Sequence, residues 1–143
     1  MIHGEDIKQL IPQRFPLMMV DEFESCDENA ASTSLTIRKD NYFLLPDGTM
    51  SLTGVIEHMA QSCSALAGYN ARFRRSEGSD SAPIGLLGEV KCFENQRLVR
   101  LGEQVRTDIH FDLTFGSVTI ARAESTVDGE VVATSQLKIF MQS

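Results

Sequence analysis

One carboxylate lies in a segment that is otherwise free of acidic residues. Residues 54–69 read Gly-Val-Ile-Glu-His-Met-Ala-Gln-Ser-Cys-Ser-Ala-Leu-Ala-Gly-Tyr, and Glu57 is the acidic one. The small and apolar residues around it predict a helix buried on most sides, because a surface helix carries a broad polar stripe. A carboxylate is costly to desolvate unless it is paired or used. Glu57 is therefore the first candidate for a general acid or base.

Several neighbours of Glu57 could support such chemistry. Gly54 lies near the expected helix N-terminus, where a bare backbone and free N–H groups can approach a substrate carbonyl. Gln61 follows one turn later, and it either orients the carboxylate or a water, or packs at a helix contact. His58 points about 100° away from Glu57, toward a partner subunit or a supporting group. Asp47 could add a second carboxylate, although Pro-Asp-Gly is first of all a turn signal.

The rest of the chain predicts strands on either side of this helix. The expected elements are a helical turn over 6–10, strands over 17–23 and 31–38, a helix from 51 or 53 to 74, and strands over 84–93, 104–115, 118–127 and 131–141. A loop over 40–53 and a polar loop over 76–82 flank the helix, and Asp128-Gly129 is a hairpin signal. A single buried helix needs a sheet that curls around it. We expect an α+β fold, with a curved antiparallel sheet wrapped around one long central helix, as a single domain over residues 1–143.

Composition limits the class of protein. The chain has 143 residues and 42% hydrophobic content, which suits one core, and it has no apolar run long enough for a membrane span. The net charge of −7 argues against a nucleic-acid partner. Cys26, Cys63 and Cys92 lie far apart without a C-x-x-C pair, so we expect neither a disulfide framework nor a metal site. Together with the absence of a secretory signal pattern, this favours a cytoplasmic protein.

Several strings spread over the chain carry a family resemblance. They are Leu-Ile-Pro-Gln-Arg-Phe-Pro-Leu-Met-Met-Val-Asp at 10–21, Glu-His-Met-Ala-Gln at 57–61, Gly-Glu-Val-Lys-Cys-Phe at 88–93 and Val-Arg-Leu-Gly-Glu at 99–103. Their order and spacing resemble those of the hotdog-fold 3-hydroxyacyl-(acyl-carrier-protein) dehydratases. The strings at 84–88 and 137–140 look most similar to a divergent subgroup of predicted dehydratases that is linked to aryl-polyene-type pigment pathways.

The resemblance implies a site and also shows a departure from it. It implies that Glu57 is the catalytic carboxylate and that the N-terminus of the buried helix polarises a thioester carbonyl. Members of the family carry a histidine in a Gly-His-Phe-Pro loop about 14 residues before this glutamate. Residues 42–51 contain no histidine here. The expected acid/base pair is therefore incomplete in this chain, and a fold alone does not confer an activity.

The resemblance also implies partners. It predicts a thioester of acyl carrier protein or coenzyme A as the substrate, no cofactor, and a homodimer, a higher oligomer or a heterodimer with a paralogue. Five arginines could dock an acidic carrier protein. They are Arg72, Arg74 and Arg75 at the helix C-terminus and Arg97 and Arg100 in a later turn. Cations at a helix C-terminus are also expected from the helix dipole alone.

Three functions remain open from the sequence. The favoured one is a dehydratase-like enzyme that acts on 3-hydroxyacyl thioesters of acyl carrier protein in fatty acid, polyene or polyketide synthesis. The second is a hotdog acyl thioesterase that uses the helix carboxylate. The third is a non-catalytic subunit that binds acyl chains or partners a complete paralogue.

Overall fold

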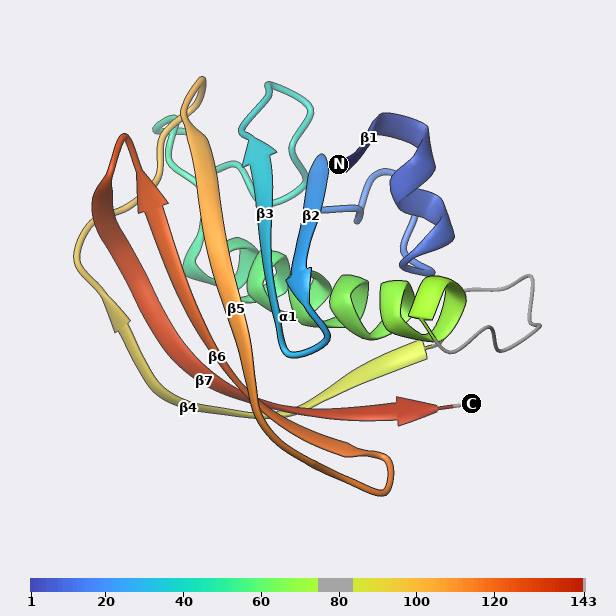
Figure 1. Cartoon of the computed structure of the whole chain (residues 1–143). Helices are drawn as coiled ribbons and strands as arrows, with labels where there is room; N and C mark the ends of the chain where they lie inside the picture. Colours follow the sequence, from blue (N-terminus) through green and yellow to red (C-terminus); the bar gives the residue numbers. More distant parts are fainter. Residues whose placement is uncertain (75–83, 143) are drawn as a thin grey trace.

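One curled sheet and one helix make up most of the protein. The structure, a computed structural model, describes residues 1–74 and 84–142. Seven antiparallel strands lie in the order β1-β2-β3-β5-β6-β7-β4. They are β1 (Ile2–His3), β2 (Glu22–Asp27), β3 (Ala30–Thr36), β4 (Ile84–Asn95), β5 (Gln104–Phe115), β6 (Val118–Val127) and β7 (Glu130–Gln142). The sheet curves around helix α1 (Leu52–Tyr69), which confirms the predicted α+β architecture (Figure 1).

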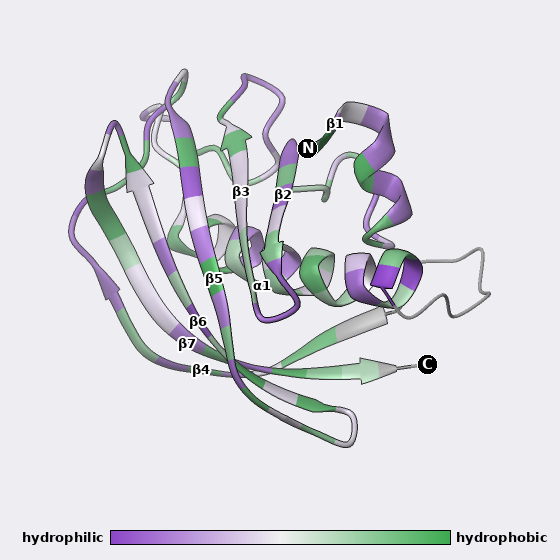
Figure 2. Ribbon diagram, viewed as in Figure 1, coloured by the Kyte–Doolittle hydropathy of each residue, from purple (hydrophilic) through white to green (hydrophobic). Residues whose placement is uncertain are grey.

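Helix α1 is the centre of the core. The Ser51 hydroxyl caps its first turn by accepting a hydrogen bond from the Gly54 N–H at 3.3 Å. Twelve of its 18 residues are buried, and the helix contacts every strand from β2 to β7. It ends at Tyr69 and continues as a π-helical turn, η2 (Asn70–Arg74), so the segment predicted as one helix has two parts. The helix is mostly apolar or weakly polar along its length (Figure 2).

Buried and exposed side chains alternate along β5, except at its end. Val105, Thr107 and Ile109 are buried, while the residues between them are exposed. Leu113 lies further along the same series and is 54% exposed. The register of β5 against β6 shifts between Phe111 and Leu113, and the hairpin of these two strands extends beyond the helix (Figure 1). The bulge therefore removes the end of β5 from the core.

The prediction of a strand over residues 17–23 is wrong. Residues 17–21 form no strand, and β2 begins at Glu22. Met19 and Val20 are nevertheless buried, at 1% exposure each. The Met19 backbone is hydrogen-bonded to side chains of α1 instead of a neighbouring strand. A buried apolar run of strand length can thus be a loop when a helix supplies its hydrogen-bond partners.

The N-terminal segment differs slightly from the prediction, whereas the predicted hairpin before the last strand is present. The turn expected over 6–10 is a 3-10 helix, η1 (Gly4–Gln9), and it follows the short strand β1, which the pattern did not predict. In Figure 1, η1 lies over the C-terminal half of α1. The Asp128-Gly129 hairpin is confirmed, because φ is positive at both residues, at 50° and 82°. The loop predicted over 76–82 lies outside the described residues.

Gly68 offers a test of how tightly η1 and α1 pack. A Cβ at Gly68 would overlap the carbonyl oxygen of Leu10. Gly68→Ala should therefore lower the free energy of unfolding by about 1–3 kcal/mol, although alanine has the higher helix propensity. Urea unfolding measures this change. Ala67→Ser, at the half-buried neighbouring position, is the control and should cost about 0.5 kcal/mol. A Gly68→Ala variant more stable than the wild type would show that this packing is absent.

Candidate functional site

Glu57 lies in the second turn of α1 and is half-buried. One of its oxygens, Oε1, accepts a hydrogen bond from the Gln61 side-chain amide at 2.8 Å. Within the part of the chain that the structure describes, its other oxygen, Oε2, accepts no hydrogen bond. The carboxylate is thus held by the protein through one of its two oxygens.

Gln61 is itself held in one orientation. Its Oε1 accepts from the Met19 N–H at 2.6 Å, and its Nε2 donates to the Leu17 carbonyl at 2.7 Å as well as to Glu57. Gln61 is 1% exposed, so water does not compete for these bonds. The loop over residues 17–19 and the Glu57 carboxylate are therefore linked through a single buried amide.

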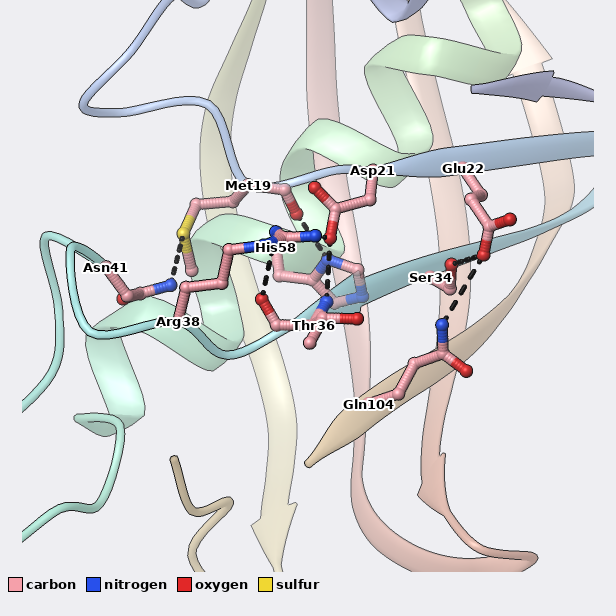
Figure 3. Close-up of polar contacts among 9 residues, drawn as sticks. All are labelled: Met19, Asp21, Glu22, Ser34, Thr36, Arg38, Asn41, His58 and Gln104. Carbon is pink, nitrogen blue, oxygen red and sulfur yellow. Dashed lines mark hydrogen bonds and ion pairs between the residues drawn. The ribbon is translucent and has the colours of Figure 1, made fainter. Parts of the chain in front are cut away.

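His58 turns away from Glu57 into the core. Its Nδ1 lies 2.6 Å from the Met19 carbonyl oxygen (Figure 3). Its Nε2 lies 2.8 Å from the Thr107 hydroxyl. The side chain is fully buried, and this burial lowers the pKa of His58, so the ring is neutral. The Thr107 hydroxyl lies a further 2.6 Å from the hydroxyl of Ser125. His58 therefore joins α1 to the Met19 loop and to strands β5 and β6.

Phe43 occupies the position at which the resemblance would place a histidine, 14 residues before Glu57. It is half-buried and packs against the core, and a Cβ at Gly54 would lie only 2.6 Å from the Phe43 Cβ. Gly54 also donates its N–H to the Ser51 carbonyl at 2.9 Å. The bare backbone of Gly54 therefore makes room for Phe43 and Met50 within the protein.

Asp47 lies in the turn that its sequence indicates. Its Oδ1 accepts from the N–H of Thr49 at 2.9 Å and from the Thr49 hydroxyl at 2.6 Å. The hydroxyl bond is the main cause that lowers the pKa of Asp47, which is fully exposed. The structure therefore brings Gln61, and not Asp47, into contact with Glu57.

The four predicted docking arginines that the structure describes do not form one patch. Arg97 makes a two-pronged bond to Glu103, at 3.0 and 2.9 Å, and also contacts Glu130 at 3.1 Å. Arg100 is exposed and pairs with Thr49, in the loop that precedes α1. Arg72 and Arg74 lie at the opposite end of the helix, roughly 20 Å along its axis from Glu57. Arg75 lies outside the described residues.

The groups that support the helix side chains were not predicted from the sequence. These are the Met19 backbone and the hydroxyls of Thr107 and Ser125. One signal for Thr107 was available, because it is the polar residue in the series Val105, Thr107, Ile109 on the buried face of β5. No side-chain pattern could reveal the contribution of Met19, since it comes from the backbone.

Exposed apolar side chains gather near the start of α1. They come from the loop over 15–17, from the loop over 42–45 and from the helix itself. Their exposed fractions are 72% for Phe15, 44% for Leu17, 62% for Tyr42, 42% for Leu45 and 41% for Leu52. Loops 15–18 and 40–41 meet at a small pocket between them. Exposed apolar side chains that lie together near Glu57 indicate a surface that another molecule or subunit covers.

These features define a protein of the hotdog dehydratase class, with a curved sheet around a helix that presents a glutamate. The sequence profile of the ApeP-like family, described as ApeP dehydratase, matches residues 5–143. The chain belongs to this family. It is also 24% identical over 140 residues to the 3-hydroxyacyl-[acyl-carrier-protein] dehydratase FabZ of Ligilactobacillus salivarius, and the match covers 96% of each chain.

Solved structures show the same fold. The dehydratase heterocomplex ApeI:P from Xenorhabdus doucetiae contains a chain that matches with a TM-score of 0.86 at 20% identity, covering 96% of this chain and 91% of that one. A hypothetical thioesterase from Streptococcus pneumoniae, solved with coenzyme A, matches with a TM-score of 0.64 at 10% identity over 85% of each chain. At these identities the two structures establish the hotdog fold alone. Among the described residues, no helix is long and apolar enough to cross a membrane.

Burial of neutral His58 predicts a pH dependence of stability. The folded pKa is depressed, so below about pH 6.5 the unfolded chain binds a proton that the folded chain does not. The contribution of neutral His58 to the free energy of unfolding is therefore fully present above about pH 6.5. It is lost as the pH falls, with a slope of up to about 1.4 kcal/mol per pH unit. Urea unfolding at several values between about pH 5 and pH 7 measures it.

The matched variant is His58→Asn, which should lose this slope. Carboxylates with lowered pKa values, such as Glu103 beside Arg97, lose their stabilising effect only below about pH 4.5 and do not interfere. An equal slope in the wild type and in His58→Asn would contradict the assignment of a buried neutral His58.

Proposed function

We propose that this chain is a subunit of a dehydratase that removes water from 3-hydroxyacyl thioesters of acyl carrier protein, with Glu57 as one of two acid/base groups. The observation that carries the proposal is the Glu57 carboxylate, half-buried on a buried helix, with Gln61 bonded to one oxygen only. The family description and the names of the FabZ relatives support the same reaction and substrate class.

The reaction divides into two proton transfers. A base removes a proton from the carbon beside the thioester carbonyl, the C–H electrons form the new double bond, and the C–O bond to the hydroxyl breaks. In our proposal Glu57, in its protonated form, gives a proton to the departing hydroxyl, which leaves as water. In this proposal the positive end of the α1 dipole stabilises the charge that develops on the carbonyl oxygen.

We infer that the second acid/base group comes from outside this chain. The chain has three histidines: His58 is buried between Met19 and Thr107, His110 contacts Asp112 on the exposed face of β5, and His3 lies exposed in β1. None is bonded to Glu57, and Phe43 stands at the expected position.

We assign the missing histidine to a partner subunit that covers the apolar surface near the start of α1. The ApeI:P heterocomplex supports a partner of a related kind, so we propose an ApeI-like paralogue. The exposed thiols of Cys26 and Cys92 suit a reducing compartment, and we place this assembly in the cytoplasm.

Glu57→Gln tests the proposal. It should lower dehydration by at least about 100-fold while leaving the fold intact, because the side-chain oxygen of the introduced glutamine can still accept from Gln61. The assay mixes the chain with its ApeI-like paralogue and a 3-hydroxyacyl thioester of acyl carrier protein, and intact mass reports the loss of one water. Undiminished water loss in this variant would overturn the role of Glu57. Loss of the whole acyl group would instead indicate thioester hydrolysis and would overturn the proposed reaction.

Arg100 is the predicted docking arginine that lies exposed on the loop side of the site. Arg100→Glu should raise KM for the carrier-bound substrate about tenfold and leave kcat unchanged, because it reverses one surface charge toward an acidic carrier. Arg72→Glu at the far end of α1 is the matched control and should have a smaller effect. A larger rise in KM for Arg72→Glu would place the docking surface at the other end of the helix. An unchanged KM in both variants would favour a coenzyme A thioester.

A further inference from the structure

The backbone of Met19 contacts two side chains of α1. Its carbonyl oxygen bonds to His58 at 2.6 Å, and its N–H bonds to Gln61 at 2.6 Å. Gln61 in turn donates to Glu57 at 2.8 Å. The C=O and the N–H lie in the two peptide groups on either side of the Met19 Cα, so buried His58 is connected to the carboxylate through the backbone of this one residue.

The direction of the first bond follows from the partners of His58. A neutral imidazole has one N–H and one acceptor nitrogen. The Met19 carbonyl can only accept, so Nδ1 carries the hydrogen and Nε2 accepts from the Thr107 hydroxyl. The Thr107 oxygen is then free to accept from Ser125, 2.6 Å away. Each member of this network has one consistent role.

The amide of Gln61 cannot reverse without losing all of its bonds. In the reversed orientation its NH2 group would face the Met19 N–H, and its oxygen would face the Leu17 carbonyl and the Glu57 carboxylate. Unpaired buried polar groups of this kind are costly. The positions of the Met19 N–H and the Leu17 carbonyl therefore decide that Glu57 meets a donor.

We propose that His58 is a positioning residue for Glu57, acting through the Met19 backbone and Gln61. This inference rests on the proposed function, because positioning matters for catalysis only if Glu57 reacts. A positioning role differs from a role in core packing alone in one respect. Only the Nδ1 bond to Met19 leads toward Glu57, whereas the Nε2 bond leads to Thr107 in the sheet.

Two substitutions at His58 separate these bonds. The amide of asparagine reaches the position of Nδ1, so His58→Asn keeps a donor for the Met19 carbonyl and loses the Thr107 contact. The longer glutamine places its amide near the position of Nε2, so His58→Gln keeps Thr107 and loses Met19. Thr107→Val is the control for the sheet side of the network. Circular dichroism and thermal unfolding show that each variant is folded before it is assayed.

The direct measurement is the NMR signal of the Gln61 side-chain amide, recorded on the chain itself. His58→Gln should shift this signal and speed its hydrogen exchange, and with the paralogue present it should lower kcat by about tenfold or more while KM changes little. His58→Asn should restore the Gln61 signal and most of kcat. Thr107→Val should lower thermal stability and leave the Gln61 signal in place.

An unchanged Gln61 signal in His58→Gln, or equal changes in the Asn and Gln variants, would overturn the role of His58. Glu57→Gln, assayed alongside, separates this claim from the proposed function. Full turnover in Glu57→Gln overturns the proposed function whatever the amide signal shows. An inactive Glu57→Gln together with an unperturbed Gln61 signal in His58→Gln overturns only the inference about His58.

Discussion

The two hydrogen bonds made by the Met19 backbone are the constraint on which the rest of the structure depends. A buried N–H or C=O without a partner costs about 1–3 kcal/mol. Asp21 donates its N–H to Ser34 of β3, but the N–H and C=O of Met19 bond to side chains of α1. His58 and Gln61 provide both partners from one face of α1. The loop is therefore held against the helix, β2 begins after it, and the same bonds leave a Gln61 N–H directed at Glu57. The hydrogen bonds that hold the loop against α1 therefore also orient Gln61 toward Glu57.

Much of the fold could be predicted from the sequence because its signals are local. The alternation of Val105, Thr107 and Ile109 and the Asp128-Gly129 turn report directly on strand and hairpin geometry. The prediction of a strand over residues 17–23 failed for a physical reason. An apolar run of this length is buried equally well as a strand or as a loop. Only the side chains of His58 and Gln61, some 40 residues later, decide between them, and no local pattern contains that information.

The site was predictable in part for the same reason. Glu57 is conspicuous because it is a charge in an apolar helix, and Gln61 follows it at the spacing of one turn. The packing role of Gly54 was not predictable from its position in the sequence. Its missing side chain accommodates Phe43 and Met50, so the residue that stands where a histidine is expected packs against the protein itself. Packing therefore explains a phenylalanine at this position. In our proposal the second acid/base group comes from another subunit.

The most direct test of that account is a titration. Increasing amounts of this chain are added to a fixed amount of its ApeI-like paralogue, and dehydration of a 3-hydroxyacyl thioester of acyl carrier protein is followed. If Glu57 and a partner histidine form one site, the rate should rise with added chain and level off when the two proteins are equimolar. A rate that does not change as this chain is added would contradict a shared site.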